Sequence, residues 1–163
     1  MVRLYWLVSV FMSLLLVVIL FNGLYQNPSR LESPMIGETI TDIEGLVDLN
    51  SNAQVGGLPT LKRPYLIHIW SIWCDVCLRE IPQFSSVVGD IPVIGIKHGE
   101  DLFEYDDYFD YNWTLDLRYH PLNNPFLVDL GVVSFPETYL VSGDGEILAI
   151  HQGALTEAIW EKI

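Results

Sequence analysis

The sequence Trp70-Ser71-Ile72-Trp73-Cys74-Asp75-Val76-Cys77 holds both cysteines of the chain, with two residues between them. It continues a proline-bounded run of aliphatic and aromatic residues at positions 64–70, which predicts a buried central strand. A helix is expected to begin at Cys74, because the apolar residues that follow recur at the spacing of one helical face. Those apolar residues are Leu78, Ile81, Phe84 and Val88. The cysteines therefore fall at a predicted junction between a strand and a helix.

The spacing of the two cysteines favours a redox function. Two cysteines three positions apart on a first helical turn place their sulfurs on one side, close enough for a reversible disulfide. A purely structural bridge would restrain little of the unfolded chain, because it closes a very short loop. A zinc site would need two further ligands, and the chain has no second cysteine pair.

The position of each cysteine predicts its role. Cys74 is expected to attack, because the unpaired amides and the positive dipole end of a helix N-terminus favour a thiolate. Cys77, one turn deeper, would resolve the mixed disulfide. Asp75 lies between them, and its negative charge is expected to raise the pKa of the Cys74 thiol. A less stabilised thiolate means a more reducing couple, so the motif predicts a reductant rather than a strong oxidant.

Further strands and helices are predicted on both sides of this junction. Strands are expected at residues 91–97 and 113–117, and a hairpin at 138–152 with its turn at Ser142-Gly143-Asp144-Gly145. Short helices are expected at residues 126–130 and from Thr156, and an earlier hairpin is expected at residues 38–49 around Glu44-Gly45. Together these elements predict an α/β sandwich with a mixed sheet.

The first two dozen residues predict a membrane-spanning helix. No charged residue occurs between Leu4 and Leu24, a length that spans about 30 Å as a helix, the thickness of a bilayer core. A cleaved signal peptide would need a shorter apolar region and a small-residue cleavage site, and neither is present. Arg3 favours an N-terminus on the inside. We therefore expect an anchor at residues 1–25, crossing the bilayer with residues 4–24, a tether at 26–34 and a domain at 35–163.

The charge of the chain argues against nucleic acid as a partner. The formal net charge is -13, and the eight basic residues are scattered rather than clustered. Acidic residues alternate with aromatic ones at positions 100–110. This segment predicts either an amphipathic surface helix with a solvated acidic face or a docking surface for a basic partner.

The quoted segment resembles the W-x-x-W-C-x-x-C signature of the thioredoxin superfamily. Pro82 occupies the family's helix-kinking proline position, and Phe135-Pro136-Glu137-Thr138 resembles the segment that contains its cis-proline. The pattern at residues 131–138 is most similar to the membrane-tethered cytochrome c maturation thioredoxins of the DsbE/CcmG type, with ResA and TlpA as relatives. The resemblance covers residues 35–163 and implies a thioredoxin-like fold, a mixed sheet flanked by helices.

The resemblance implies a set of site residues around Cys74 and Cys77. Trp73 would support the pair, and Phe135-Pro136 would form a cis peptide beside Cys74, where the backbone before the proline pairs with an extended substrate. The chain departs from the family in two places. Asp75 and Val76 replace a more usual proline-containing pair, and a histidine, His68, is unusual in the strand.

Three titratable residues have possible supporting roles. His68 would relay a proton to or from Cys77, or would be a neutral core histidine. Glu80 would tune the thiol pKa, or would be an exposed helix carboxylate. The resemblance to the cytochrome c maturation thioredoxins implies that Glu137 would line the substrate groove. The other histidines, His98, His120 and His151, are expected to be ordinary surface or loop residues.

The resemblance also implies a function. The protein would reduce disulfides in the C-x-x-C-H sites of apocytochrome c before haem attachment, and a membrane thiol reductant of the DsbD/CcdA type would recharge it. It would sit in a bacterial inner membrane with one span and its domain in the periplasm, and would need no metal and no cofactor beyond the disulfide. A general periplasmic disulfide oxidoreductase is one alternative. A copper chaperone of the SCO kind is another, although that family uses a wider C-x-x-x-C spacing.

Overall fold

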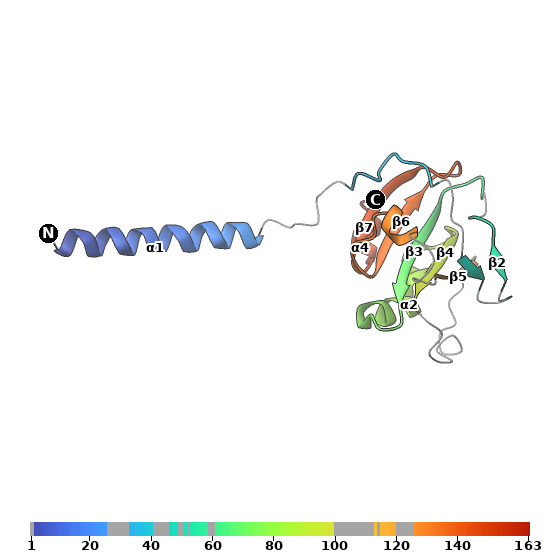
Figure 1. The fold of residues 1–163 in the computed structure, drawn as a ribbon, viewed down its shortest axis with the longest axis horizontal. Coiled ribbons are helices and arrows are strands. Elements are labelled where there is room, and N and C mark those ends of the chain that lie inside the picture. The colour runs from blue at the N-terminus through green and yellow to red at the C-terminus, as the bar shows by residue number, and fades with distance from the viewer. Residues whose placement is uncertain are drawn as a thin grey trace. The chain divides into compact units, whose positions relative to one another are not determined.

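The computed structural model describes residues 2–25, 33–40, 46–48, 51, 53–58, 61–99, 113, 115–119 and 126–163. These residues fall into two compact units, Met1–Glu32 and Ser33–Ile163. The described part of the first unit is the helix α1 (Val2–Tyr25), drawn in blue in Figure 1. Its stretch Tyr5–Gly23 is long and apolar enough to cross a membrane, and none of it is buried in the protein. A membrane anchor and a signal sequence both fit that description, whereas a buried core helix does not.

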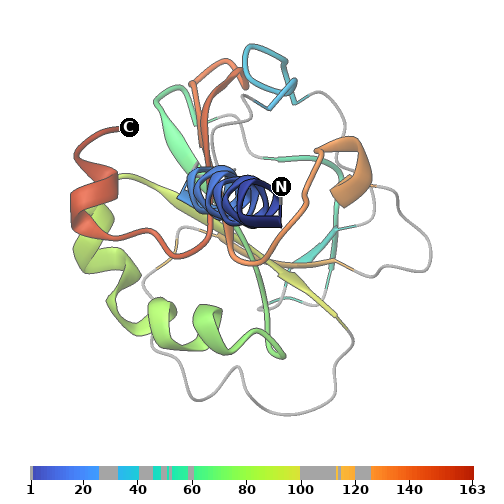
Figure 2. The same ribbon diagram turned by 90° about the vertical axis from the view of Figure 1, so that its left-hand side faces the viewer.

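The second unit is built on one mixed sheet (Figures 1 and 2). The described residues form seven strands in the order β2-β1-β5-β4-β3-β6-β7, with β3, β4 and β5 parallel and the other neighbours antiparallel. The strands are β1 (Leu46–Asp48), β2 (Gln54–Val55), β3 (Tyr65–Ser71), β4 (Val93–His98), β5 (Leu115–Tyr119), β6 (Glu137–Val141) and β7 (Ile147–Gln152). Every residue of the central strand β3 is buried, as its apolar run predicted.

Helices cover both faces of the sheet. The domain helices are α2 (Asp75–Val88), α3 (Phe126–Asp129) and α4 (Glu157–Trp160), and Figure 2 shows α2 and α4 on one side with α3 on the other. Because side chains alternate along a strand, Tyr65, Ile67 and Ile69 of β3 join the core beside α3. Leu66 packs against residues of α2 and α4, and Trp70 packs against Cys74 and Cys77. The predicted α/β sandwich is confirmed.

Helix α2 begins directly after the turn that follows β3, as predicted. Cys74 is its N-cap residue, in an extended conformation with φ −94° and ψ 100°. Pro82 lies inside the helix, and Gly89 ends it in the left-handed region with φ 69°. A left-handed residue at this position costs glycine little, because glycine has no Cβ to clash with the backbone.

Most of the other predicted elements are present within a few residues of their expected bounds. The early hairpin is an exception, because its two flanks pair with different partners. Thr39 forms a bridge with Glu146, whereas Leu46 pairs with Val55 of β2 and Tyr119 of β5. The expected turn at Glu44-Gly45, the acidic segment at 100–110 and His120 lie outside the described residues.

Aromatic rings fill the space between β3, β4 and α2. A Cβ atom added at Gly95 of β4 would lie 1.9 Å from two ring carbons of Trp113. The Trp113 ring also meets those of His68, Trp70 and Phe84, with centroid distances of 5.7, 6.0 and 6.3 Å. Gly95 is therefore required by the close approach of the indole to the sheet.

Candidate active site

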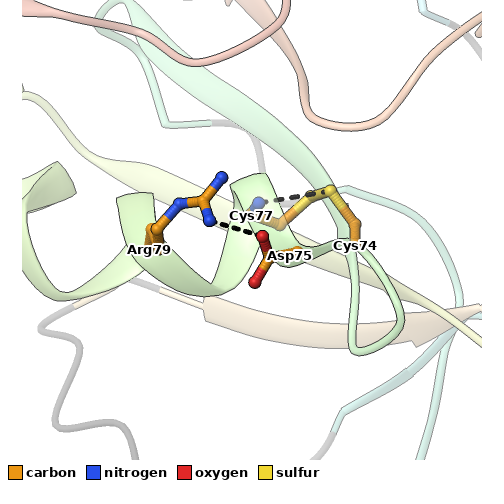
Figure 3. Close-up of polar contacts among 4 residues, drawn as sticks. All are labelled: Cys74, Asp75, Cys77 and Arg79. Atoms are coloured by element: carbon orange, nitrogen blue, oxygen red, sulfur yellow. Dashed lines mark hydrogen bonds and ion pairs between the residues drawn. A yellow bond between two sulfur atoms is a disulfide. The ribbon is translucent and has the colours of Figure 1, made fainter.

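The two cysteines form a disulfide at the N-terminus of α2, with their Cα atoms 5.2 Å apart. The Cys77 backbone N–H donates to the Cys74 sulfur over 3.2 Å, and Figure 3 draws this contact. Cys74 is 9% exposed, whereas Cys77 is fully buried. A cysteine that is less buried than its partner, and whose sulfur accepts a hydrogen bond from a helix amide, fits the role of the attacking thiol.

Asp75 forms an ion pair with Arg79, one turn further along α2 (Figure 3). Both side chains are exposed, so the pair contributes little to stability. The positive charge of the Arg79 guanidinium nevertheless opposes the negative charge that Asp75 places beside Cys74. The effect of Asp75 on the couple is therefore expected to be smaller than the motif alone suggests. The motif alone does not point to Arg79, although its position four residues after Asp75 on a predicted helix is a signal for this ion pair.

The loop before β6, which contains Phe135 and Pro136, lies against the turn between β3 and α2, here called the active-site turn. The peptide bond between Phe135 and Pro136 is cis, as the resemblance implied. The Phe135 ring packs edge-on against Trp73, with their centroids 5.1 Å apart. The Pro136 carbonyl accepts a hydrogen bond from the Gly153 N–H over 2.8 Å. The structure thus brings the cis-proline loop next to the residue that precedes Cys74.

His98 completes an aromatic cluster with Trp73 and Phe135. Its ring stacks on Phe135 at 5.2 Å with an interplanar angle of 12°, and meets Trp73 edge-on at 6.0 Å. Burial lowers the pKa of His98. The expectation of an ordinary surface residue is wrong, because His98 ends β4 beside the carboxyl end of β3, where the active-site turn starts. Sites in parallel sheets gather at this edge, a signal that could have identified His98.

His68 lies fully buried in the middle of β3. Its Nδ1 is 3.0 Å from the Thr138 hydroxyl on β6, and its ring is 4.3 Å from that of Phe84. Its Nε2 has no hydrogen-bond partner within the described part of the chain. Burial lowers the pKa of His68 to about 3. The imidazole is therefore neutral near neutral pH, and a proton relay to Cys77 stays a prediction.

Glu80 is buried, although one of the two interpretations had placed it on an exposed helix face. Its side chain is 3% exposed, and its Oε1 accepts a hydrogen bond from the Leu155 N–H over 2.6 Å. Its Oε2 has no partner among the described residues. Burial raises the pKa of Glu80 to about 7, against the opposing effect of the Leu155 hydrogen bond. The exposed interpretation is wrong, and tuning of the thiols stays a prediction.

Glu137 turns inwards, so its expected place along a substrate groove is wrong. The side chain is 1% exposed. Its Oε2 accepts hydrogen bonds from the Val133 and Ser134 amides at 3.1 and 3.2 Å, and its Oε1 accepts one from the Tyr139 hydroxyl at 2.8 Å. Burial and the adjacent carboxylate raise the pKa of Tyr139. Three converging donors explain why the carboxylate faces the protein rather than solvent.

No protein-family model matches the chain. Among curated proteins, DsbE from Pseudomonas aeruginosa is 28% identical over an alignment 162 positions long, which covers 91% of this chain and 84% of that protein. DsbE from Pseudomonas fluorescens is 27% identical over 95% of this chain and 89% of its own length. DsbE from Escherichia coli is 27% identical over 86% and 78%. All three are described as thiol:disulfide interchange proteins.

Solved structures agree on the fold. The thioredoxin domain of a thiol-disulfide oxidoreductase from Bacteroides vulgatus superposes with a TM-score of 0.61 at 17% identity, covering 78% of this chain and 94% of that one. A thio-disulfide isomerase from Thermus thermophilus superposes with a TM-score of 0.56 at 22% identity, covering 78% and 92%. The disulfide at the start of α2, the fold and these relatives together identify the chain as a thioredoxin-fold thiol:disulfide oxidoreductase that is homologous to DsbE over most of its length.

Proposed function

We propose that this chain reduces the disulfides of apocytochrome c at its C-x-x-C-H sites, so that the freed thiols can receive haem. The observation that carries the proposal is the Cys74–Cys77 disulfide beside the cis-proline loop, in a chain whose curated relatives are DsbE proteins. The Asp75 charge between the cysteines favours the reducing direction, although its pairing with Arg79 limits that effect.

The exchange proceeds in two steps. In the reduced protein the Cys74 thiolate attacks one sulfur of the substrate disulfide, which forms a mixed disulfide and releases one substrate thiolate. The Cys77 thiolate then attacks the Cys74 sulfur, which releases the second substrate thiolate and closes the Cys74–Cys77 disulfide. Two electrons pass to the substrate, and its thiolates take up two protons. A membrane thiol reductant of the DsbD/CcdA type would return the two electrons.

Phe135 is the proposed docking point for the substrate backbone. Its own N–H and carbonyl make no backbone hydrogen bond within the described part of the chain. The β3–β6 ladder stops at the Ile69–Glu137 pair, so Phe135 lies just beyond the end of the paired strand. An extended peptide can form main-chain hydrogen bonds with such an unpaired backbone segment. The exposed Trp73 ring beside Phe135 would cover the apolar side chains of the substrate.

The proposed location is supported by α1. We propose that α1 stays attached as a single-pass anchor in a bacterial inner membrane and that the oxidoreductase domain faces the periplasm. The charge-free stretch of the helix supports an anchor, and Arg3 before it supports an N-terminus on the inside. Attachment to the membrane would keep the domain near both the exported apocytochrome and the membrane reductant.

Two buried groups are proposed to help the thiols. His68 would pass a proton to or from Cys77, and Glu80, which titrates near neutral pH, would tune the thiol pKa. The reversible disulfide would be the only redox group. Among the described residues no three His, Cys, Asp or Glu side chains are gathered as metal ligands.

The test is to trap partners with Cys77→Ser in native membranes and identify them by mass spectrometry. Without the resolving thiol, the mixed disulfide at Cys74 persists. We expect apocytochromes c and a membrane thiol reductant, both absent from a Cys74→Ser, Cys77→Ser control. Diverse exported proteins without cytochromes would instead favour the general oxidoreductase. Empty traps together with stoichiometric Cu(I) binding would favour the copper chaperone.

A further inference from the structure

The Glu137 carboxylate binds the backbone of Val133 and Ser134, the two residues that precede Phe135. One of its oxygens accepts from two consecutive amides, those of Val133 and Ser134, and the other accepts from the Tyr139 hydroxyl. Hydrogen bonds to an ionised acceptor are stronger than those between neutral groups. We call this set of contacts the carboxylate clamp.

Phe135 is held between two fixed points. The carboxylate clamp holds the two amides that precede it, and the Gly153 N–H holds the carbonyl of Pro136 that follows it. No backbone group among the described residues hydrogen-bonds to Phe135 itself, and its ring packs against Trp73 and His98. The contacts therefore fix the position of Phe135 without occupying its own hydrogen-bonding groups.

The carboxylate is also an expensive way to hold a loop. Glu137 is 1% exposed, and a buried charge loses its hydration. Replacing buried ionic groups by apolar ones of similar volume is often neutral or stabilising. A role that only stabilised the fold would not need a polar side chain here, whereas holding two amides in one register requires an acceptor at this place.

We propose that Glu137 is a positioning residue for exchange with peptide disulfides. Its carboxylate fixes Phe135 where an extended substrate pairs with it, and contacts neither the substrate nor the cysteine sulfurs. The inference rests on the proposed function, because it assumes that Phe135 receives the substrate backbone. It differs from a groove-lining role in that Glu137 acts through the Val133 and Ser134 amides.

The experiment compares two disulfides in their reaction with the reduced full-length protein in detergent. The first is an oxidised peptide with a C-x-x-C-H site, which has a backbone that can pair with Phe135. The second is the aromatic disulfide DTNB, which has none. We expect Glu137→Ala to lower the rate constant for the peptide by about tenfold, the equivalent of one charged hydrogen bond, and to change that for DTNB by less than about twofold.

A conservative variant separates position from charge. In Glu137→Gln the amide oxygen can still accept from the Val133 and Ser134 N–H groups, while the amide nitrogen can donate to the Tyr139 oxygen. We expect this variant to keep the peptide rate constant within about threefold of wild type. Val141→Ala, at the other end of β6, controls for a general loss of stability and should leave both rate constants unchanged.

Each result decides the question. Equal loss in Glu137→Ala and Glu137→Gln would overturn the proposal by showing that the charge matters rather than the clamp. A normal peptide rate in Glu137→Ala, or the same selective loss in Val141→Ala, would also overturn it. If the wild-type protein reacts with the peptide no faster than dithiothreitol does, the proposed function is wrong, and the inference that rests on it is wrong as well. If wild type and Glu137→Ala both react rapidly with the peptide, only the inference about Glu137 is overturned and the proposed function stands.

Discussion

The change Glu80→Gln is expected to alter how stability depends on pH. Burial raises the pKa of Glu80 from 4.5 to about 7, so the folded protein holds this proton more tightly than the unfolded chain does. The contribution of Glu80 to stability is therefore greatest below pH 4.5 and is lost as the pH rises through 7. The variant cannot ionise. Its free energy of unfolding relative to wild type should rise by about 3 kcal/mol between pH 4.5 and 7.

The titration of His68 changes the expected dependence of the free energy of unfolding on pH. Burial lowers its pKa from 6.5 to about 3, so its contribution is complete above pH 6.5 and is lost as the pH falls towards 3. Between pH 4.5 and 6.5 the slopes from His68 and Glu80 oppose each other, and these two groups leave wild-type stability nearly flat. In Glu80→Gln only the His68 slope remains, so stability should fall on acidification by about 1.4 kcal/mol per pH unit.

The assay is chemical unfolding of the oxidised full-length protein in detergent, followed by tryptophan fluorescence at half-unit steps of pH. The Gln side chain keeps an oxygen that can accept from the Leu155 N–H, so the hydrogen bond survives the change. Glu161→Gln, the same substitution at an exposed position, controls for the loss of one charge. A Glu80→Gln difference that stays constant from pH 4 to 8 would refute the burial argument.

Three other substitutions test the packing and the motif. Gly95→Ala should destabilise the domain by about 1–3 kcal/mol, because its Cβ would overlap the Trp113 ring, and thermal unfolding measures this. Asp75→Asn should raise the reduction potential by less than about 30 mV, measured against glutathione, because Arg79 already opposes the Asp75 charge. Arg79→Gln should lower the potential, and a shift of either variant in the opposite direction would contradict this reasoning. Trp73→Ala should slow exchange with the oxidised peptide while leaving the melting temperature unchanged, because the Trp73 side chain is largely exposed; equal slowing with DTNB would argue against a docking role.

Local sequence patterns were sufficient for the framework of the domain. The apolar run before the cysteines predicted β3, and the spacing of apolar residues after Cys74 predicted the buried face of α2. Both signals depend on residues that are close in the chain and on the periodicity of one element. The turn at 142–145 likewise predicted the β6–β7 hairpin from its own residues.

The residues that sequence reasoning misplaced are those whose surroundings come from distant parts of the chain. Glu80 is buried because Leu155, which is 75 positions away, brings its N–H to the carboxylate. His98 contacts the site because two parallel strands end at one edge of the sheet. Glu137 has its amide donors nearby in sequence, but the bend of the loop that directs them inwards cannot be seen in a sequence pattern.

The segment between β7 and α4 contacts both halves of the active site. The Gly153 N–H binds the Pro136 carbonyl in the cis-proline loop, and the Leu155 N–H binds Glu80 on the helix that carries the cysteines. These contacts make the segment a brace between loop and helix, although it supplies no sulfur and no ring to the site. Cutting the chain after Gln152 would leave every proposed catalytic residue in place and still separate the two halves. A fusion partner at the C-terminus consequently needs a linker that leaves this brace undisturbed.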